Sequence, residues 1–198
     1  ESYDIQKYLR EMVNDGVEYL VMEVSSQALK VGRVDGMMFD YGVFTNLSED
    51  HIGNNEHKDM EEYIYCKSLL FKMCKNGIFN IDDIHYNEMI KDCTCKVYTF
   101  GHNKEANLVI DKVELLRKEH FIGLEMKTSG IVNDVFLVNT PGEFSAYNSA
   151  CAIIVTTLLG CNIDSIKDAL SKVAVRGRVE IVPVSKKYTV IIDYAHNG

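Results

Sequence analysis

The chain has 198 residues, of which 46% are hydrophobic and 25% charged, a composition typical of a globular domain. Its net charge of -8 argues against a general nucleic-acid-binding protein, because neutralising phosphates requires a surplus of lysine and arginine. The same charge still permits a phosphate ligand that a few local groups bind. The length suits one sizeable domain, or one domain with an inserted subdomain.

The cysteines and the apolar runs predict a cytoplasmic protein with no membrane partner. The six cysteines include no Cys-x-x-Cys pair and several lie in apolar runs, so we expect buried, reduced thiols and no zinc site. The apolar run at 150–160 is too short to cross a bilayer, and no signal peptide is recognisable. Because the chain starts without a methionine and stops abruptly at DYAHNG, we expect both ends to belong to something longer.

The first part of the chain alternates between helical and strand-like patterns. Apolar residues at helical spacing predict a helix over 4–15, and the run VEYLVMEV predicts a buried parallel strand over 17–24. After a polar loop, a second buried strand is expected over 39–47. A helix is then predicted from residue 60 to about residue 74.

The middle of the chain continues this alternation and then departs from it. A strand is predicted over 77–82, a helix over 83–93 and a strand over 96–101. Residues 106–139 contain three strand-like runs with little helix between them. We therefore expect a small antiparallel insertion at 106–139.

The last part returns to helices and strands. Helices are predicted over 143–160 and 163–172, and strands over 179–184 and 188–194. Strands that alternate with helices predict an α/β fold. We therefore expect one domain over 1–198, with a three-layer, mostly parallel sheet, helices on both faces, and the antiparallel insertion.

Three of the expected strands end in polar side chains, at the edge where parallel α/β sheets bind ligands. We expect these side chains to lie at the rim of a ligand or metal site. They are Glu23 at the end of the first strand, followed by Ser25 and Ser26; Thr45 and Asn46 at the end of the second, followed by the Ser-Glu-Asp-His loop; and Asp193, Tyr194 and His196 at the last.

Five segments, in order along the whole chain, resemble motifs of the Mur ligase family, and most closely those of its MurE branch. The resemblance implies the central ATPase domain of such a ligase. The segments are MEVSSQALKVGRVDGMMFDYGVFTNLSEDH at 22–51, MEEYIYCKSLLF at 60–71, TPGEFSAYNSACAI at 140–153, RGRVEIV at 176–182 and VIIDYAH at 190–196.

The resemblance implies an ATP-dependent amide ligase of peptidoglycan synthesis with ATP and Mg²⁺ as cofactors. Such enzymes phosphorylate the carboxylate of a UDP-N-acetylmuramoyl peptide to an acyl phosphate, which the amine of an amino acid attacks. The family's glycine-rich phosphate loop ends in Gly-Lys, and this chain contains no Gly-Lys pair. We therefore expect a partial central domain that is inactive in isolation, with a homodimer as a hypothesis for its uncovered sheet edge.

The resemblance also implies roles for three residues in metal binding and catalysis. Glu23 matches a ligand of the ATP-bound magnesium ion, and His51 matches the histidine that ligates a second one. Lys67 matches the family lysine that reacts with carbon dioxide. The resulting carbamate is an anion, so that it can orient a magnesium ion.

The other implied roles concern the nucleotide and the muramoyl peptide. Asn148 matches the residue that contacts adenine, Arg178 an arginine near the ATP phosphates, and Asp193 the aspartate that binds the ribose hydroxyls. Two further pairs are expected at the substrate. Ser25 and Arg33 match residues that contact it, and Thr45 and Asn46 lie at the same rim and shape the site more weakly.

Some positions depart from the family pattern. Gln27 stands where a histidine is common, and Val31 where MurE often has a glutamine. The loop that follows His51 is about two residues longer than in common MurE sequences, and we expect Glu56 and His57 in it to be solvated rather than to bind a third metal ion.

Two other interpretations stay open at this point. The chain is also similar in architecture to folylpolyglutamate and cyanophycin synthetases, although the 22–36 segment favours MurE. Alternatively, the absence of the phosphate loop favours a catalytically silent binding module. Binding of Mg-ATP distinguishes a ligase from such a module.

Overall fold

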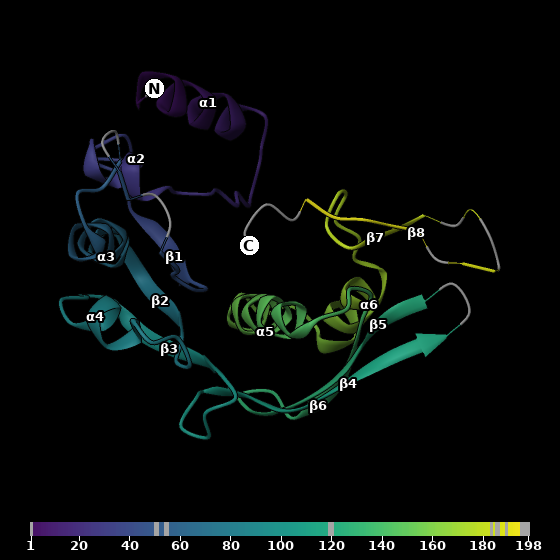
Figure 1. The fold of residues 1–198 in the computed structure, drawn as a ribbon. Helices are drawn as coiled ribbons and strands as arrows, with labels where there is room; N and C mark the ends of the chain where they lie inside the picture. Colours follow the sequence, from purple (N-terminus) through teal and green to yellow (C-terminus); the bar gives the residue numbers. More distant parts are fainter. Residues whose placement is uncertain are drawn as a thin grey trace. The chain divides into compact units, whose positions relative to one another are not determined.

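The computed structural model describes residues 2–49, 52–53, 56–118, 121–182, 184, 187–188 and 190–194 (Figure 1). The chain divides into two compact units. The first unit comprises Glu1–Phe79 and Asp83–Val97, and the second comprises Asn80–Asp82 and Tyr98–Gly198.

The main sheet has six strands in the order β1-β2-β3-β4-β5-β6. Strands β1 and β2 pair in parallel, as do β3 and β4, whereas β4, β5 and β6 pair antiparallel. This mixed sheet with flanking helices confirms the predicted α/β class and the antiparallel segment within it. The strands are β1 Phe39–Phe44, β2 Cys74–Asn80, β3 Lys96–Gly101, β4 Leu108–Lys118, β5 Phe121–Gly130 and β6 Asp134–Val138.

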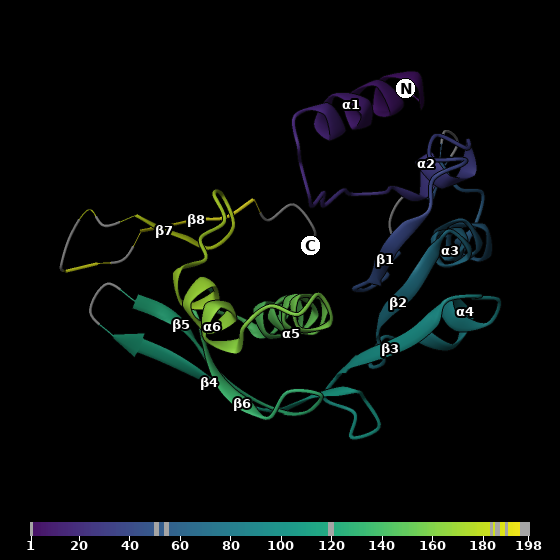
Figure 2. The same cartoon turned by 180° about the vertical axis from the view of Figure 1, so that it is seen from behind.

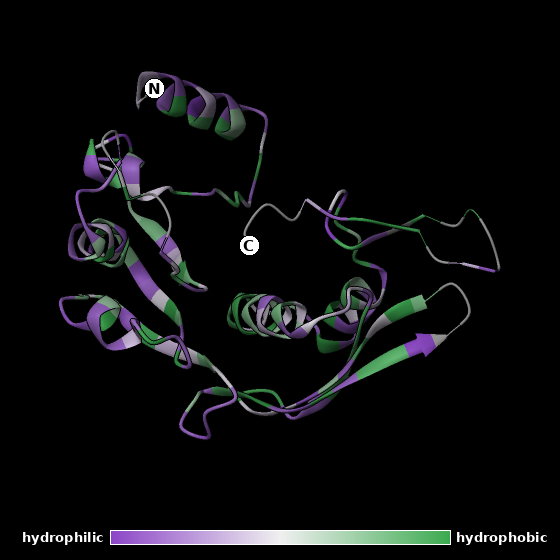
Figure 3. Ribbon diagram, in the orientation of Figure 1, coloured by the Kyte–Doolittle hydropathy of each residue, from purple (hydrophilic) through white to green (hydrophobic). Residues whose placement is uncertain are grey.

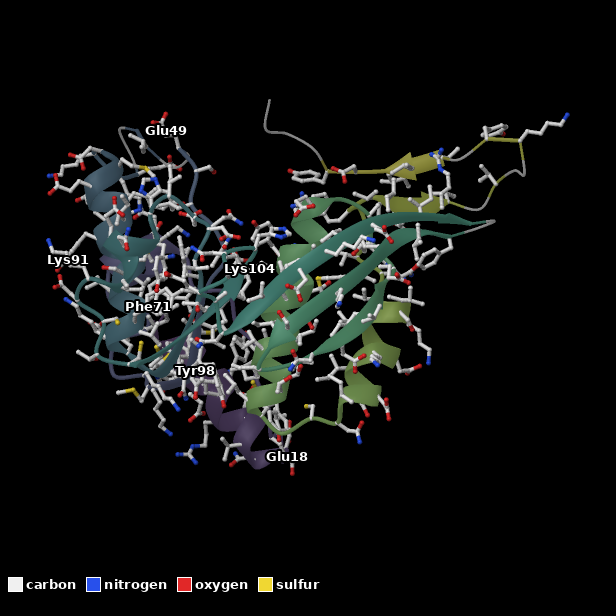
Figure 4. The ribbon with its side chains drawn as sticks, turned by 90° about the horizontal axis from the view of Figure 1, so that it is seen from below. Glu18, Glu49, Phe71, Lys91, Tyr98 and Lys104 are labelled. Carbon is white, nitrogen blue, oxygen red and sulfur yellow. The ribbon has the colours of Figure 1, made fainter. Side chains whose placement is uncertain are left out.

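The first unit packs two short helices beside β1 and β2. Helix α3, Met60–Ser68, begins at Asp59, whose carboxylate accepts the Glu62 backbone N–H at 2.8 Å, and a 3₁₀ turn over Leu69–Lys72 follows it. Helix α4 spans Tyr86–Ile90. Figure 4 shows Phe71 enclosed by other side chains. The buried core residues are Phe44, Leu47, Tyr63, Phe71, Cys74, Phe79 and Met89.

The predicted helix over 60–74 is therefore too long at its C-terminal end. Cys74 is already the first residue of β2, where it pairs with Phe39 of β1. The rings of Phe71 and Phe79 lie 4.2 Å apart between centroids, so the turn that ends the helix also contributes to the core.

The prediction of a buried strand over 17–24 is wrong. These residues form no strand, and Val17, Tyr19, Leu20 and Val21 are exposed, Val21 to 98%. Apolar, β-forming residues adopt a strand only where a neighbouring strand supplies hydrogen bonds, and no described strand pairs with this run. The run follows α1, Ser2–Asn14, which has no buried residue and on which Figure 3 shows both polar and apolar residues.

In the second unit, two helices pack on the antiparallel strands. Helix α5, Glu143–Leu158, contacts β4 and β6, and helix α6, Ile163–Lys172, contacts β6 (Figure 2). Both helices agree closely with the predicted ranges. The fully buried residues of this core include Phe100, Leu108, Met126, Phe136, Val138, Ala146, Ala150, Ile153 and Ile154.

The two C-terminal strands differ from their prediction. Strands β7, Glu180–Val182, and β8, Val190–Ile192, are shorter than expected. They pair antiparallel with each other in a separate two-stranded sheet, instead of extending the main one. Within the described residues, no helix is long and apolar enough to span a membrane.

All six cysteines are free, as predicted for reduced thiols. Their burial is less uniform than predicted. Cys66 and Cys74 are buried, whereas Cys161 is exposed. Burial raises the pKa of the Cys74 thiol, which keeps it protonated and unreactive.

Candidate functional site

A cavity of about 500 Å³ lies in the second unit and brings together three residues that the motifs single out. Asn148 comes from α5, Arg178 from the turn that follows α6, and Asp193 from the residue directly after β8. These elements are separate in the sequence, so only the tertiary fold places them around one space. The lining residues are Thr140, Phe144, Ser145, Asn148, Ser149, Ala152, Leu170, Val173, Val175, Arg178 and Asp193.

Helix α5 presents Asn148 to the cavity through its regular spacing. Phe144, Asn148 and Ala152 are four residues apart, so they lie along the same side of the helix, and all three line the cavity. The helix starts after Gly142, which has a φ of 93°, a conformation that side chains with a Cβ rarely adopt. A Cβ there would also lie 2.5 Å from the Phe144 ring, which would have to shift to make room for it.

The turn that carries Arg178 is fixed by hydrogen bonds to the end of β8. The Asp193 carboxylate accepts the Val179 backbone N–H at 2.8 Å, and the Arg178 guanidinium donates to the Tyr194 carbonyl at 3.2 Å. Val179 has a φ of 47°, which is strained for a β-branched residue. Asp193 therefore stabilises an unfavourable backbone conformation beside Arg178.

An aspartate that sequence reasoning missed fixes the residue next to Asn148. The Asp82 carboxylate accepts a hydrogen bond from the Tyr147 hydroxyl at 2.8 Å and from the backbone N–H groups of His102 and Asn103. Burial, together with the Asp82 hydrogen bond, raises the pKa of Tyr147, so its hydroxyl stays protonated and donates. The sequence offered one clue to this contact. Tyr147 belongs to the Tyr-Asn pair of the motif, and its hydroxyl needs a hydrogen-bond partner.

The replacement Asp82→Asn is expected to destabilise the second unit. The amide keeps one acceptor oxygen but loses the charge, so three donors lose a charged partner. Hydrogen bonds to charged groups contribute about 1.5–3 kcal/mol, and because Asp82 is exposed we expect a loss of about 1–2 kcal/mol in the free energy of unfolding. Urea titration of the variant measures it, with exposed Asp92→Asn as control, and equal stabilities of the two variants would contradict the role.

In the first unit, Glu23 and Lys67 lie close enough to interact electrostatically. Lys67 is half-buried on α3, with its Nζ 5.2 Å from the centroid of the Tyr63 ring. Burial lowers the pKa of the Lys67 ammonium, and the Glu23 carboxylate partly opposes that shift by stabilising the charge. Glu23 itself is exposed and lies in the non-strand segment that precedes α2, Ser26–Lys30.

The predicted substrate residues occupy the ends of two elements. Ser25 is the N-cap of α2, where its hydroxyl accepts the Ala28 backbone N–H at 3.1 Å. Arg33 is half-buried and donates its backbone N–H to the Ala28 carbonyl. Thr45 and Asn46 are exposed and directly follow β1, which ends at Phe44, three residues before the end of the predicted strand over 39–47.

The predicted metal ligands are only partly visible. His51 lies outside the described residues. Within the described part of the chain, no group of three His, Cys, Asp or Glu side chains is placed to hold a metal ion. Glu23 is the described carboxylate beside Lys67, so a complete metal site would need groups from elsewhere.

The expectation of a solvated loop is wrong for His57. Its side chain is fully buried, with Nε2 2.8 Å from the Ser26 hydroxyl and its ring stacked on Tyr63 at 5.0 Å between centroids. Polar neighbours in the sequence predicted exposure, but contacts with α2 and α3 bury the ring. Glu56 is exposed, in agreement with the expectation.

Comparisons with known proteins place this geometry in a family. The model of the Mur ligase middle domain matches residues 1–156. A UDP-N-acetylmuramoyl-L-alanyl-D-glutamate–2,6-diaminopimelate ligase of Caldanaerobacter subterraneus is 42% identical over 198 residues, covering 99% of this chain and 40% of the relative. A UDP-N-acetylmuramyl-tripeptide synthetase of Ligilactobacillus salivarius is 35% identical, covering 100% of this chain and 42% of that protein.

Solved structures show the same fold. The structure of a UDP-N-acetylmuramoyl-L-alanyl-D-glutamate–2,6-diaminopimelate ligase aligns with a TM-score of 0.82 at 24% identity, covering 98% of this chain and 40% of the other. A folylpolyglutamate synthase of Mycobacterium tuberculosis aligns less well, with a TM-score of 0.61 at 17% identity, covering 80% of this chain and 36% of the other. The chain spans about two fifths of the length of the curated relatives it matches. From the family model and these relatives, the chain belongs to the Mur ligase family, in which it corresponds to the middle domain.

Proposed function

We propose that this chain is the nucleotide-binding part of an ATP-dependent amide ligase that joins an amino acid to a UDP-N-acetylmuramoyl peptide in peptidoglycan synthesis. The observation that supports it most strongly is the cavity lined by Asn148, Arg178 and Asp193. The names of two relatives that the chain matches supply the substrate class. The proposed reaction uses ATP and the six cysteines of the chain are free thiols, two features that suit the cytoplasm.

The cavity has the chemistry that a nucleotide requires. Apolar side chains from α5 and α6 suit the faces of a planar base, and the Asn148 amide can both donate to and accept from its edge. The Arg178 guanidinium suits phosphate oxygens. Asp193 already accepts one backbone hydrogen bond, and a carboxylate has further acceptor sites for ribose hydroxyls.

The described residues fit a magnesium site that relies on few protein ligands. Magnesium prefers hard oxygen ligands, retains several waters and commonly uses one or two carboxylates, a role that suits the exposed Glu23. We propose that Lys67 supplies a second anionic group as a carbamate, which forms when the neutral amine adds to carbon dioxide and releases a proton. Bound magnesium would neutralise the negative charge that develops during phosphoryl transfer.

In the proposed reaction, the residues of this chain position the reactants. Phosphoryl transfer to the substrate carboxylate gives an acyl phosphate and ADP, and attack by an amine then gives the amide and phosphate. Ser25, the N-cap of α2, and Arg33, which follows that helix, would orient the muramoyl peptide, and Thr45 and Asn46 would shape the site more weakly. A glycine-rich phosphate loop and the amino-acid-binding groups would come from outside the chain, so we expect no ligation by the chain alone.

Calorimetric titration of the chain with Mg-ATP tests this proposal. We expect binding by the wild-type chain and at least about tenfold weaker binding by Asn148→Ala, because the amide contact to the base is lost. Asn87→Ala, an exposed asparagine of α4, is the matched control and should bind as the wild type does. Absence of binding by the wild-type chain, or equal binding by all three proteins, would contradict the nucleotide assignment.

The homodimer expected from the sequence concerned an uncovered sheet edge, and we propose the exposed 17–21 run as a further contact surface for it. Four of its five residues are exposed apolar side chains, which commonly mark a contact surface. Sedimentation velocity at high protein concentration tests it. A single monomeric species would count against a dimer.

A further inference from the structure

His57 joins the loop that follows His51 to the N-terminal end of α2. Its Nε2 lies 2.8 Å from the hydroxyl of Ser26, and both side chains are buried, His57 completely and Ser26 to 4% exposure. Ser26 directly follows Ser25, the cap of α2. A buried polar side chain is stabilising only when it is paired, so this contact fixes how the loop and the helix meet.

The backbone of His57 closes the same loop on itself. His57 and Ile52 form an isolated β-bridge, and the Gly53 N–H donates to the His57 carbonyl at 3.1 Å. The Glu56 N–H in turn donates to the Gly53 carbonyl at 3.1 Å. Ile52 is the residue after His51 in the sequence, so His57 fixes the chain directly behind a predicted magnesium ligand.

The His57 ring also contacts the helix that carries Lys67. It stacks on Tyr63 with an interplanar angle of 25°, and the Lys67 Nζ lies 5.2 Å from the centroid of the same tyrosine ring. The ammonium of Lys30 also links the same three elements. Lys30 of α2 donates to the Glu62 carboxylate of α3 at 2.9 Å and to the Glu56 carbonyl at 3.1 Å.

We propose that His57 is a positioning residue that holds three elements in one arrangement: the loop behind His51, the N-terminal end of α2 and the lysine helix α3. It acts through Ser26 on the substrate side and through Tyr63 on the Lys67 side. The expected effect of His57 on catalysis rests on the proposed ligase function, whereas the contacts of His57 do not.

The geometry argues against a hydrolytic Ser-His-Glu triad in the same residues. The Ser26 hydroxyl is buried, so a substrate cannot reach it. The His57 Nδ1 is 3.7 Å from the Glu62 carboxylate, which is longer than a hydrogen bond. Glu62 instead accepts the Lys58 N–H and the Lys30 ammonium, which lower its pKa and keep it ionised.

Four variants of the full-length parent protein test the inference. His57→Phe keeps a ring for stacking but removes the hydrogen bond to Ser26, and Ser26→Ala removes the same bond from the other side. His57→Gln is the conservative variant, since its amide reaches the Ser26 hydroxyl. His85→Asn is the matched control, because His85 is a partly buried histidine at the start of α4, away from these contacts.

Steady-state kinetics gives the first measurement. We expect kcat to fall at least about tenfold in His57→Phe and Ser26→Ala, because small misplacements of reacting groups are costly. The KM for Mg-ATP should stay within about twofold, since the proposed nucleotide residues belong to the second unit. His57→Gln should recover kcat to within about threefold of wild type, and His85→Asn should match wild type. A wild-type kcat in His57→Phe, or a His57→Gln variant as impaired as His57→Phe, would overturn the inference.

Amide hydrogen exchange gives a second measurement that needs no activity. The Gly53 amide, bonded to His57, and the Ala28 amide, bonded to the Ser25 cap, should exchange faster in His57→Phe and normally in His57→Gln. Unchanged exchange of both amides in His57→Phe would overturn the inference, whatever the kinetic measurement shows. If the wild-type parent forms no amide, the proposed function fails, and hydrogen exchange alone then decides the role of His57.

Discussion

Replacing Lys67 by alanine is expected to abolish amide formation in the full-length parent, with kcat reduced by about a thousandfold or more. Lys67 is half-buried on α3 beside Glu23, where the proposed carbamate would orient a magnesium ion. Alanine leaves no group that can replace this anion. Because alanine is the best helix former and Lys67 contributes to the core only through its contact with the Tyr63 ring, we expect the free energy of unfolding to stay within about 1 kcal/mol of wild type.

Two controls separate the carbamate from the positive charge. Lys67→Arg keeps a cation at this position but forms no carbamate, so it should be as inactive as Lys67→Ala. Lys72→Ala removes an exposed lysine from the 3₁₀ turn after α3 and should retain full activity. Product formation and ADP release are measured together with thermal unfolding. Normal turnover by either Lys67 variant would refute the carbamate assignment.

Filling the cavity of the second unit with Ala152→Trp should weaken Mg-ATP binding by about a hundredfold or more. Ala152 is exposed on α5 and lines the cavity one helical turn from Asn148, so an indole at this position occupies the space proposed for the base. A hundredfold loss corresponds to about 2.7 kcal/mol, which is small for complete exclusion of a ring from its pocket. Because the side chain points into open space, the helix itself should remain folded.

The matched control places the same indole on the other helix. Ser165→Trp lies on an exposed position of α6 that does not line the cavity, so it should bind Mg-ATP as the wild-type chain does. Calorimetric titration and circular dichroism of both variants give the answer. Unchanged affinity in Ala152→Trp would place the nucleotide elsewhere.

Local patterns predicted the elements whose partners are close in the sequence. Helices α5 and α6 and strand β3 appear nearly where their periodicity places them, because each buries a face that the pattern itself defines. The 17–24 run has an equally clear pattern and yet forms no strand. A strand needs a neighbour that its own residues do not specify, so this prediction failed for a non-local reason.

The same distinction applies to the candidate site. The motifs singled out Asn148, Arg178 and Asp193, and the fold brings them to one cavity, although their roles stay predictions. Asp82 and His57 carry no recognisable pattern. Asp82 matters because it accepts a hydrogen bond from the hydroxyl of Tyr147, which lies 65 positions away in the sequence. His57 matters because its ring nitrogen pairs with the hydroxyl of Ser26, which lies 31 positions away. Contacts of this kind are fixed by tertiary packing and cannot be read from spacing.

The strained backbone at Val179 gives Asp193 two tasks that are thermodynamically linked. The carboxylate that the motif assigns to a ribose also holds Val179 at its positive φ. A ligand that binds the Asp193 carboxylate therefore contacts the same group on which the backbone conformation of Val179 depends. By reciprocity, a ligand that shifts the conformation of the Val179 turn through Asp193 would itself bind with an affinity that depends on that conformation. A substitution at Val179, which does not line the cavity, would then change affinity without removing a contact to the ligand.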